Sequence, residues 1–198
     1  MPKQKKSYSA NIQMEIKTHT NQRILAAVKA LTLDFWLDEI TLLQIAEKAN
    51  VSIQTLFRHF GSREQLIQHA VSQISAEIRV QHAIPEEVSV QSIVSNLDEY
   101  YDLNGLFIIR LRSQAARLAE FEEFQAGWQN SHHRWIQNSF AVYLQALTTV
   151  SQNELTDTLF GLTDVHFWYV YHHELRKSRQ ELNLIWVRIL RSLLLSYR

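Results

Sequence analysis

A run of polar side chains at residues 52–59 has the types and spacing needed to recognise a nucleic acid. If residues 53–60 form a helix, its outward positions are Ser52, Gln54, Thr55, Arg58 and His59. Each of these side chains can hydrogen-bond to base edges or to phosphates. We therefore predict that Gln54, Thr55, Arg58 and His59 contact base edges, and that the neighbouring Ile53 contacts a thymine methyl group.

Two short helices joined by a tight turn would position these side chains, as in a helix-turn-helix. Thr41, with Gln44 three residues later, forms a capping-box pattern before the helix expected at residues 42–49, and Ser52 is a candidate N-cap for the second helix. Asn50 lies at the turn, where a positive φ is favoured. The helix starts near Thr41 and Ser62, with the Thr41 hydroxyl and Arg63, are predicted to contact phosphates.

The segment from residue 45 to residue 66 resembles the helix-turn-helix signature of the tetracycline-repressor (TetR) family. The matching residues are Ile45-Ala46, Ala49-Asn50-Val51-Ser52, Thr55-Leu56-Phe57, His59-Phe60, Ser62-Arg63-Glu64 and Leu66. With the family-like first helix around Thr20 and Arg23, the resemblance covers about residues 20–70. It implies an effector-responsive transcriptional regulator, a repressor, that binds a pseudo-palindromic double-stranded DNA operator as a homodimer and responds to an unknown small organic effector.

Four positions depart from this signature. Asn50 and Trp36 stand where the family usually has Gly, and Arg63 stands where it usually has Lys. Phe57 replaces a Tyr whose hydroxyl commonly contacts a phosphate in the family. Phe57 stays among the predicted DNA-binding residues because its ring can still pack there, although it cannot donate a hydrogen bond.

The rest of the chain has helical apolar spacing, with no competing strand pattern. We predict an all-α protein of about nine helices, at about residues 20–35, 42–49, 53–60, 63–80, 86–102, 104–119, 121–148, 152–176 and 179–197. Capping boxes that begin at Ser62, Ser151 and Ser178 mark three of these starts. Residues 1–19 are expected to form a basic N-terminal arm, residues 20–80 a helix-turn-helix DNA-binding domain, and residues 81–198 a helical effector-binding and dimerisation domain.

The composition of the 198-residue chain excludes several classes of protein. Four Gly and two Pro make up about 3% of the residues, against roughly 12% in average usage, which excludes most turn-rich β-folds. Cysteine is absent from the sequence, which excludes disulfides and thiolate metal sites. No apolar stretch approaches the roughly 18 residues of a membrane helix, so we expect a cytoplasmic protein with no membrane partner.

The formal net charge of zero hides an uneven distribution. Residues 1–65 carry nine Lys or Arg and six Asp or Glu, a charge of +3, so the remainder carries −3. This asymmetry favours a polyanionic partner for the N-terminal part, although imbalances of this size are also common in soluble domains.

The C-terminal region is rich in aromatic residues that could enclose an organic effector. The predicted ligand-binding residues are Phe124, Trp128, His132, Trp135, His166 and Tyr169. Large aromatic side chains with a few polar tips suit an amphipathic ligand, but stripes of this kind also form ordinary cores. Both interpretations remain open from the sequence.

Apolar stripes in the last two long helical segments predict a dimer interface. The residues concerned are Leu155, Leu159, Leu162, Leu182, Trp186, Ile189 and Leu193. Each stripe is wider than contact with a single neighbouring helix requires, so it can contact a second copy of the chain as well as the chain's own core. The alternative is that both faces belong to the core of a monomer.

No catalytic residue, cofactor or metal is predicted. The adjacent histidines in the pairs 132–133 and 172–173 point in different directions on a helix, and there is no His-Glu-x-x-His pattern or nucleophile elbow. We therefore do not expect an enzyme. The alternative function is a helical carrier of a small molecule or metal, in which the helix-turn-helix is only a packing element.

Overall fold

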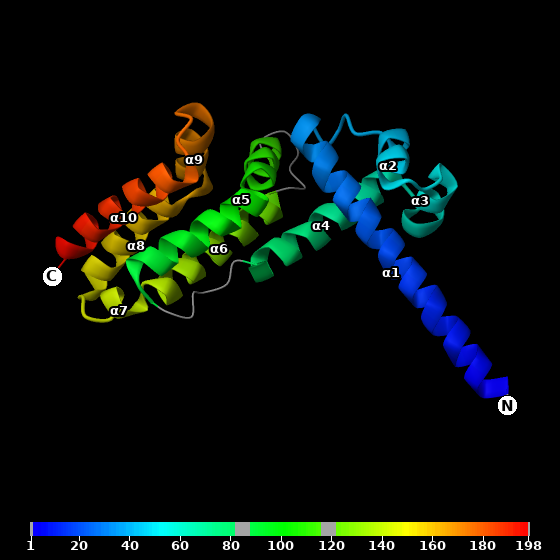
Figure 1. The fold of residues 1–198 in the computed structure, drawn as a ribbon, viewed down its shortest axis with the longest axis horizontal. Coiled ribbons are helices and arrows are strands. Elements are labelled where there is room, and N and C mark those ends of the chain that lie inside the picture. Colours follow the sequence, from blue (N-terminus) through cyan, green and yellow to red (C-terminus); the bar gives the residue numbers. More distant parts are fainter. Residues whose placement is uncertain (1, 82–87, 116–121, 198) are drawn as a thin grey trace. The chain divides into compact units, whose positions relative to one another are not determined.

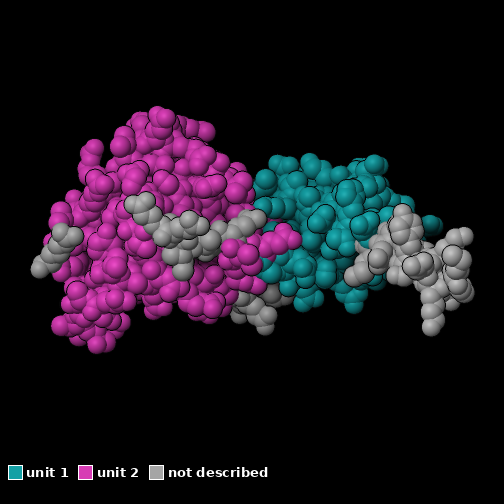
Figure 2. All heavy atoms as spheres, turned by 60° about the horizontal axis from the view of Figure 1, so that its bottom comes forward, with its two compact units in different colours: residues 1–76 teal, residues 77–198 magenta. Residues whose placement is uncertain are grey.

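The computed structural model describes residues 2–81, 88–115 and 122–197, and the side chains of residues 15–80, 88–114 and 125–197. Within these ranges every regular element is a helix, which confirms the predicted all-α class (Figure 1). The chain divides into two compact units, residues 1–76 (unit 1) and residues 77–198 (unit 2), coloured separately in Figure 2. The sequence placed the division between residues 80 and 81, next to residues 82–87, which lie outside the described ones. No described helix has both the length and the apolar content that crossing a membrane requires.

Unit 1 is built from α1 (Pro2–Asp34), α2 (Leu42–Ala49), α3 (Ile53–Phe60) and the first part of α4 (Arg63–Gln81). The helix expected at about residues 20–35 extends back to Pro2, through the residues expected to form an arm. The side chains of residues 1–14 lie outside the described ones. The helices α1 and α2 pack on each other, as do α2 and α3.

The core of unit 1 comes from the predicted apolar faces. Ile24, Val28 and Leu31 of α1 are buried, as are Ile45 of α2 and Leu56 of α3. Phe35 falls within the helix expected at about residues 20–35, but α1 ends at Asp34 and the Phe35 side chain is 37% exposed. The Phe35 amide still donates to the Leu31 carbonyl at 2.9 Å, so Phe35 closes the last turn of α1.

Unit 2 consists of α5 (Val90–Ala115), α6 (Glu122–Ser139), α7 (Ala141–Leu144), α8 (Thr149–Thr163), α9 (Val165–Tyr169), a π-helix (Val170–Glu174) and α10 (Arg179–Leu195). The long helix α5 is central to the unit, since α6, α9 and α10 all pack on it. Its buried face includes Ile93, Leu97, Tyr101, Phe107 and Leu111.

The helix α5 corrects one prediction of the sequence. Separate helices were expected at residues 86–102 and 104–119, but one helix runs without interruption past Gly105. A Cβ atom built at Gly105 would lie 2.6 Å from the Trp168 ring. Glycine here gives space to a packed indole, and does not mark a helix end.

Two further expected helices are interrupted. The segment 121–148 breaks at the buried Phe140, and 152–176 breaks at Asp164, whose backbone is extended (φ −65°, ψ 149°). Asp side chains compete with helical hydrogen bonding, and here the carboxylate caps α9 by accepting from the His166 amide at 2.8 Å. The predicted Ser151 cap is also wrong, because Thr148 caps α8 and its hydroxyl accepts from the Ser151 amide.

Candidate nucleic-acid interface

The two helices of the predicted helix-turn-helix begin at well-formed caps. The Thr41 hydroxyl accepts from the Gln44 amide at 3.2 Å, and the Gln44 side chain accepts from the Thr41 amide at 2.7 Å, so the predicted capping box is confirmed. Ser52 caps α3 by accepting from the Thr55 amide at 3.1 Å. These local bonds fix where each helix begins.

The turn between α2 and α3 depends on Asn50 and on a cation from α1. Asn50 has the left-handed conformation expected from the sequence (φ 50°, ψ 53°). The Arg23 guanidinium donates to the carbonyl oxygens of Ala49 and Asn50, at the C-terminal end of α2. A cation is favoured there because the last carbonyls of a helix carry partial negative charge. Arg23 therefore ties the turn to α1.

The helix α3 leaves most of the predicted contact residues open to solvent. Ser52, Ile53, Gln54, Phe57 and Arg58 are exposed, with Ile53 at 38% and Phe57 at 51%. Thr55 and His59 are half-buried, and Leu56 is buried beneath them. No acidic residue occurs in α3, so its open face is suited to hydrogen bonding with a polyanion.

Arg63 is turned toward the main chain of its own unit. Its Nε donates to the Ile40 carbonyl at 2.6 Å, and one Nη donates to the Leu37 carbonyl. The other Nη lies 3.5 Å from the Glu64 carboxylate, and the Arg63 side chain is 25% exposed. The guanidinium thus holds the segment between α1 and α2, which spacing alone did not indicate.

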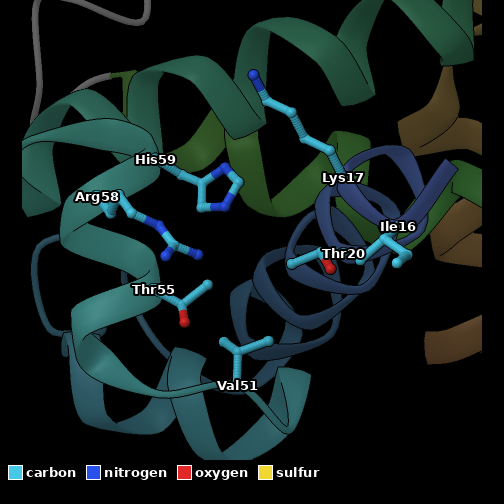
Figure 3. A pocket seen from close by; sticks show the side chains of 7 residues that line it. All are labelled: Ile16, Lys17, Thr20, Val51, Thr55, Arg58 and His59. Carbon is cyan, nitrogen blue, oxygen red and sulfur yellow. The ribbon is translucent and has the colours of Figure 1, made fainter. Parts of the chain in front are cut away.

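A hollow beside α3 brings in residues that sequence reasoning missed. Ile16, Lys17 and Thr20 of α1 line it together with Val51, Thr55, Arg58 and His59 (Figure 3). The sequence placed Lys17 in a basic arm, and only the packing of α1 in unit 1 brings it to α3. The only sequence signal for Lys17 was that it is a basic residue in the segment that precedes the helix-turn-helix.

In unit 2, part of the predicted ligand set forms an interior aromatic stack. The His132 ring lies between Trp128 and Trp135, with ring centroids 5.0 and 5.6 Å away, and all three side chains are buried. Phe160 meets the His132 ring edge-on at 5.2 Å. Phe160 is not among the predicted ligand-binding residues.

The remaining predicted ligand residues do not join that stack. The His166 side chain is 56% exposed, with its Nδ1 2.7 Å from Asp164, and Tyr169 stacks on His173 at 5.0 Å. The Phe124 side chain lies outside the described residues. The predicted ligand set therefore combined the residues of one aromatic stack with two residues of α9 that lie outside that stack.

Charged and polar groups that the sequence did not predict lie against the aromatic stack. Arg112 pairs with Asp164 at 2.8 Å, and its guanidinium carbon is 4.5 Å from the centroid of the Trp128 ring. The His132 Nε2 is 3.1 Å from the Thr163 hydroxyl, and the Tyr101 hydroxyl donates to the Thr163 carbonyl at 2.7 Å. Burial holds the pKa of Tyr101 well above its ordinary value, so this hydroxyl stays a neutral donor.

The residues predicted at a dimer interface fall into two groups. Leu155, Leu159, Leu182 and Trp186 are fully buried within the single chain, because they pack in the core of unit 2. The Trp186 indole also donates to the Leu162 carbonyl at 2.7 Å. The half-buried residues are Leu162, Ile189 and Leu193. Only this second group has surface to offer a partner.

Within the part of the chain that the structure describes, no three His, Asp or Glu side chains are grouped so as to hold a metal ion.

Comparison with known proteins gives one family match and many structural matches. Residues 37–70 match the model of the tetR family of bacterial regulatory proteins. A tetR-family transcriptional regulator from Streptomyces coelicolor is similar in structure, with a TM-score of 0.67 and 15% identity over 87% of this chain and 81% of that one. No curated protein matches the sequence.

Two further structures show the same fold at low identity. GusR from Salmonella enterica has a TM-score of 0.62 and 17% identity, over 88% of this chain and 95% of its own. A transcriptional regulator from Rhodococcus has a TM-score of 0.67 and 12% identity, over 89% and 96%. The helix-turn-helix of this chain is therefore that of the tetR family of bacterial regulatory proteins, and the chain has the fold of the transcriptional regulators in that family.

Proposed function

We propose that the protein is an effector-responsive transcriptional repressor that binds a pseudo-palindromic DNA operator as a homodimer. The observation that carries the proposal is the capped α2–turn–α3 motif, whose second helix exposes Gln54 and Arg58 and contains no acid. A helix of this size fits the major groove, and its polar tips can pair with base edges. The family match over residues 37–70 and the fold support the same function.

A salt-dependent gel shift tests DNA binding. Neutralising several phosphates releases counterions, so affinity for DNA should fall steeply as salt rises. The operator is obtained by selection from random DNA, and Gln54→Ala is then compared with Gln91→Ala, which removes an exposed glutamine from α5 in unit 2. Gln54→Ala should relax the preference at one base pair by about 1–3 kcal/mol, and Gln91→Ala should not. Absence of any salt-dependent binding would contradict the function.

The homodimer is proposed to use the outer faces of α8 and α10. Exposed positions on α8 include Val150, Glu154 and Asp157, and those on α10 include Leu184, Arg188, Arg191 and Leu195. The α8 positions include two acids and the α10 positions include two arginines, so α8 of one copy can pack against α10 of its partner with opposite charges facing each other. An added Cβ at Gly161, also on the exposed side of α8, would find open space, which leaves room for a close helix. Two α3 helices would then read half-sites about one DNA turn apart.

A charge placed on the proposed interface tests the dimer. Leu184 is 66% exposed, so Leu184→Glu should leave the fold intact and lower the mass measured by light scattering from dimer to monomer. Val142→Glu is the matched control, because Val142 is 62% exposed on α7. A monomeric wild type, or a dimer that survives Leu184→Glu unchanged, would contradict this interface.

The effector is proposed to bind beside the aromatic stack of unit 2. Trp128 and His132 are buried aromatic side chains, and the half-buried Arg112 places a cation beside them, so an amphipathic aromatic compound that enters between them matches their chemistry. Compounds of this class should be screened for release of labelled operator DNA. An active compound should lose its effect in Trp128→Leu and keep it in Trp36→Leu, a Trp of unit 1. Equal loss in both variants would place the effector elsewhere.

A further inference from the structure

A hollow of about 570 Å³ lies between α1 and α3 within unit 1. Figure 3 shows Thr55, Arg58 and His59 projecting from α3 toward Thr20 and Lys17 of α1. The three α3 residues are spaced i, i+3 and i+4, so they share one flank of the helix. Gln54 and Phe57, also three residues apart, extend the exposed surface on the side away from His59, with Gln54 one turn before Arg58 (i, i+4). The exposed surface of α3 therefore runs around the helix from Phe57 and Gln54, past Arg58, to His59.

The lining of this hollow is cationic. Lys17, Arg58 and His59 all contribute nitrogen donors, and none of the lining residues is acidic. Within the described residues, no carboxylate forms an ion pair with Lys17, Arg58 or His59. Like charges held near one another without a counter-charge repel, and an anion among them removes that repulsion. The hydroxyl groups of Thr20 and Thr55 add neutral hydrogen-bonding groups at the same place.

We propose that the hollow is a phosphate site that holds a backbone phosphate of the DNA strand running beside α3. Lys17 and Arg58 donate to the phosphate oxygens, with His59 as a third donor, and Thr20 lies at the α1 side of the site. This proposal rests on the DNA-binding function given above. It moves Arg58 and His59 from base edges to the backbone, and leaves base reading to Gln54 at the neighbouring position.

The first experiment compares Lys17→Ala with wild type on random DNA and on selected operator DNA. Lys17 is exposed on α1, so the substitution should not affect folding. Each phosphate contact contributes about 0.9 to the slope of log K against log salt, which corresponds to a loss of about eightfold at 0.1 M salt. The loss should be the same on both DNAs, and Lys17→Arg should restore most of it.

Arg134→Ala is the matched control, because it removes an exposed cation from α6 in unit 2. Its salt slope should equal that of wild type. An unchanged slope in Lys17→Ala, or a loss confined to operator DNA, would overturn the phosphate site while leaving DNA binding itself established.

The second experiment needs no DNA. Inorganic pyrophosphate is titrated into the free protein, and the imidazole resonances of His59 are followed by NMR. These resonances should move in wild type, and saturation should need at least fivefold more pyrophosphate in Lys17→Ala. Absence of any shift at His59 would overturn the site. A shift in a protein that binds no DNA would refute the proposed function, and would reassign the hollow to a free phosphate compound.

Discussion

Replacing Arg63 with alanine should destabilise unit 1 without removing a DNA contact. The Arg63 guanidinium donates to the carbonyl oxygens of Ile40 and Leu37, which belong to the segment that joins α1 to α2. The side chains of both acceptor residues are buried, at 0% and 1% exposure, so that segment is part of the core. Without the guanidinium, the two carbonyls lose charged donors that water can replace only in part.

The size of the effect follows from those two bonds. A hydrogen bond to a charged group contributes about 1.5–3 kcal/mol, and the Arg63 side chain is 25% exposed, which weakens both bonds. We therefore expect Arg63→Ala to lower the free energy of unfolding by about 2 kcal/mol. Arg63→Lys should recover about half of the loss, because one ammonium cannot reproduce the two-pronged geometry.

Urea denaturation followed by circular dichroism measures this change. Arg58→Ala is the control, since Arg58 is exposed on α3 and should alter stability by less than about 0.5 kcal/mol. In DNA binding the opposite order is expected. Arg58→Ala should lower the slope of log K against log salt, and Arg63→Ala should leave that slope unchanged. If Arg63→Ala is as stable as wild type and has a reduced salt slope, the structural role assigned to Arg63 is incorrect.

Three further predictions concern the turn, the core and a helix cap. Asn50→Ala should cost about 1 kcal/mol, because φ is 50°, whereas Asn50→Gly should be neutral in the same urea assay; equal losses would contradict the conformational argument. Gly105→Ala should cost about 1–3 kcal/mol, because its Cβ would lie 2.6 Å from the Trp168 ring, and an unchanged melting temperature would count against it. The backbone amide of Ser178 lowers the pKa of Glu181 from 4.5 to about 2, and carboxyl NMR titration can check this value. The stability that this cap contributes is therefore complete above pH 4.5 and is lost as the pH falls through 2. In acid unfolding, Glu181→Gln should lose that pH dependence.

Much of unit 1 could be predicted from sequence because its signals are local. The Thr41 and Ser52 caps each use a hydrogen bond between residues three apart, so neighbouring residue types suffice to place the helix starts. The left-handed Asn50 follows from its position between two helical patterns. The predicted bounds of α2 and α3 agree with the structure for the same reason.

In unit 2 the apolar pattern gave the helical class but not where helices break. Gly105 stays inside α5 because Trp168 packs on it, and Asp164 interrupts the α8–α9 segment while pairing with Arg112. Trp168 lies 63 residues from Gly105, and Asp164 lies 52 from Arg112. Contacts between residues so far apart in sequence do not change the spacing of apolar residues within either segment.

The sequence by itself determined the helical class, the helix-turn-helix and its caps, because each depends on residues within a turn or two of one another. The tertiary structure decided what each side chain meets. It turned Arg63 toward the main chain, buried Trp186 in the core of its own unit, and brought Lys17 to the hollow that Arg58 also lines. An amphipathic pattern reveals which side of a helix is apolar or charged, but only the packing of distant segments determines what covers that side.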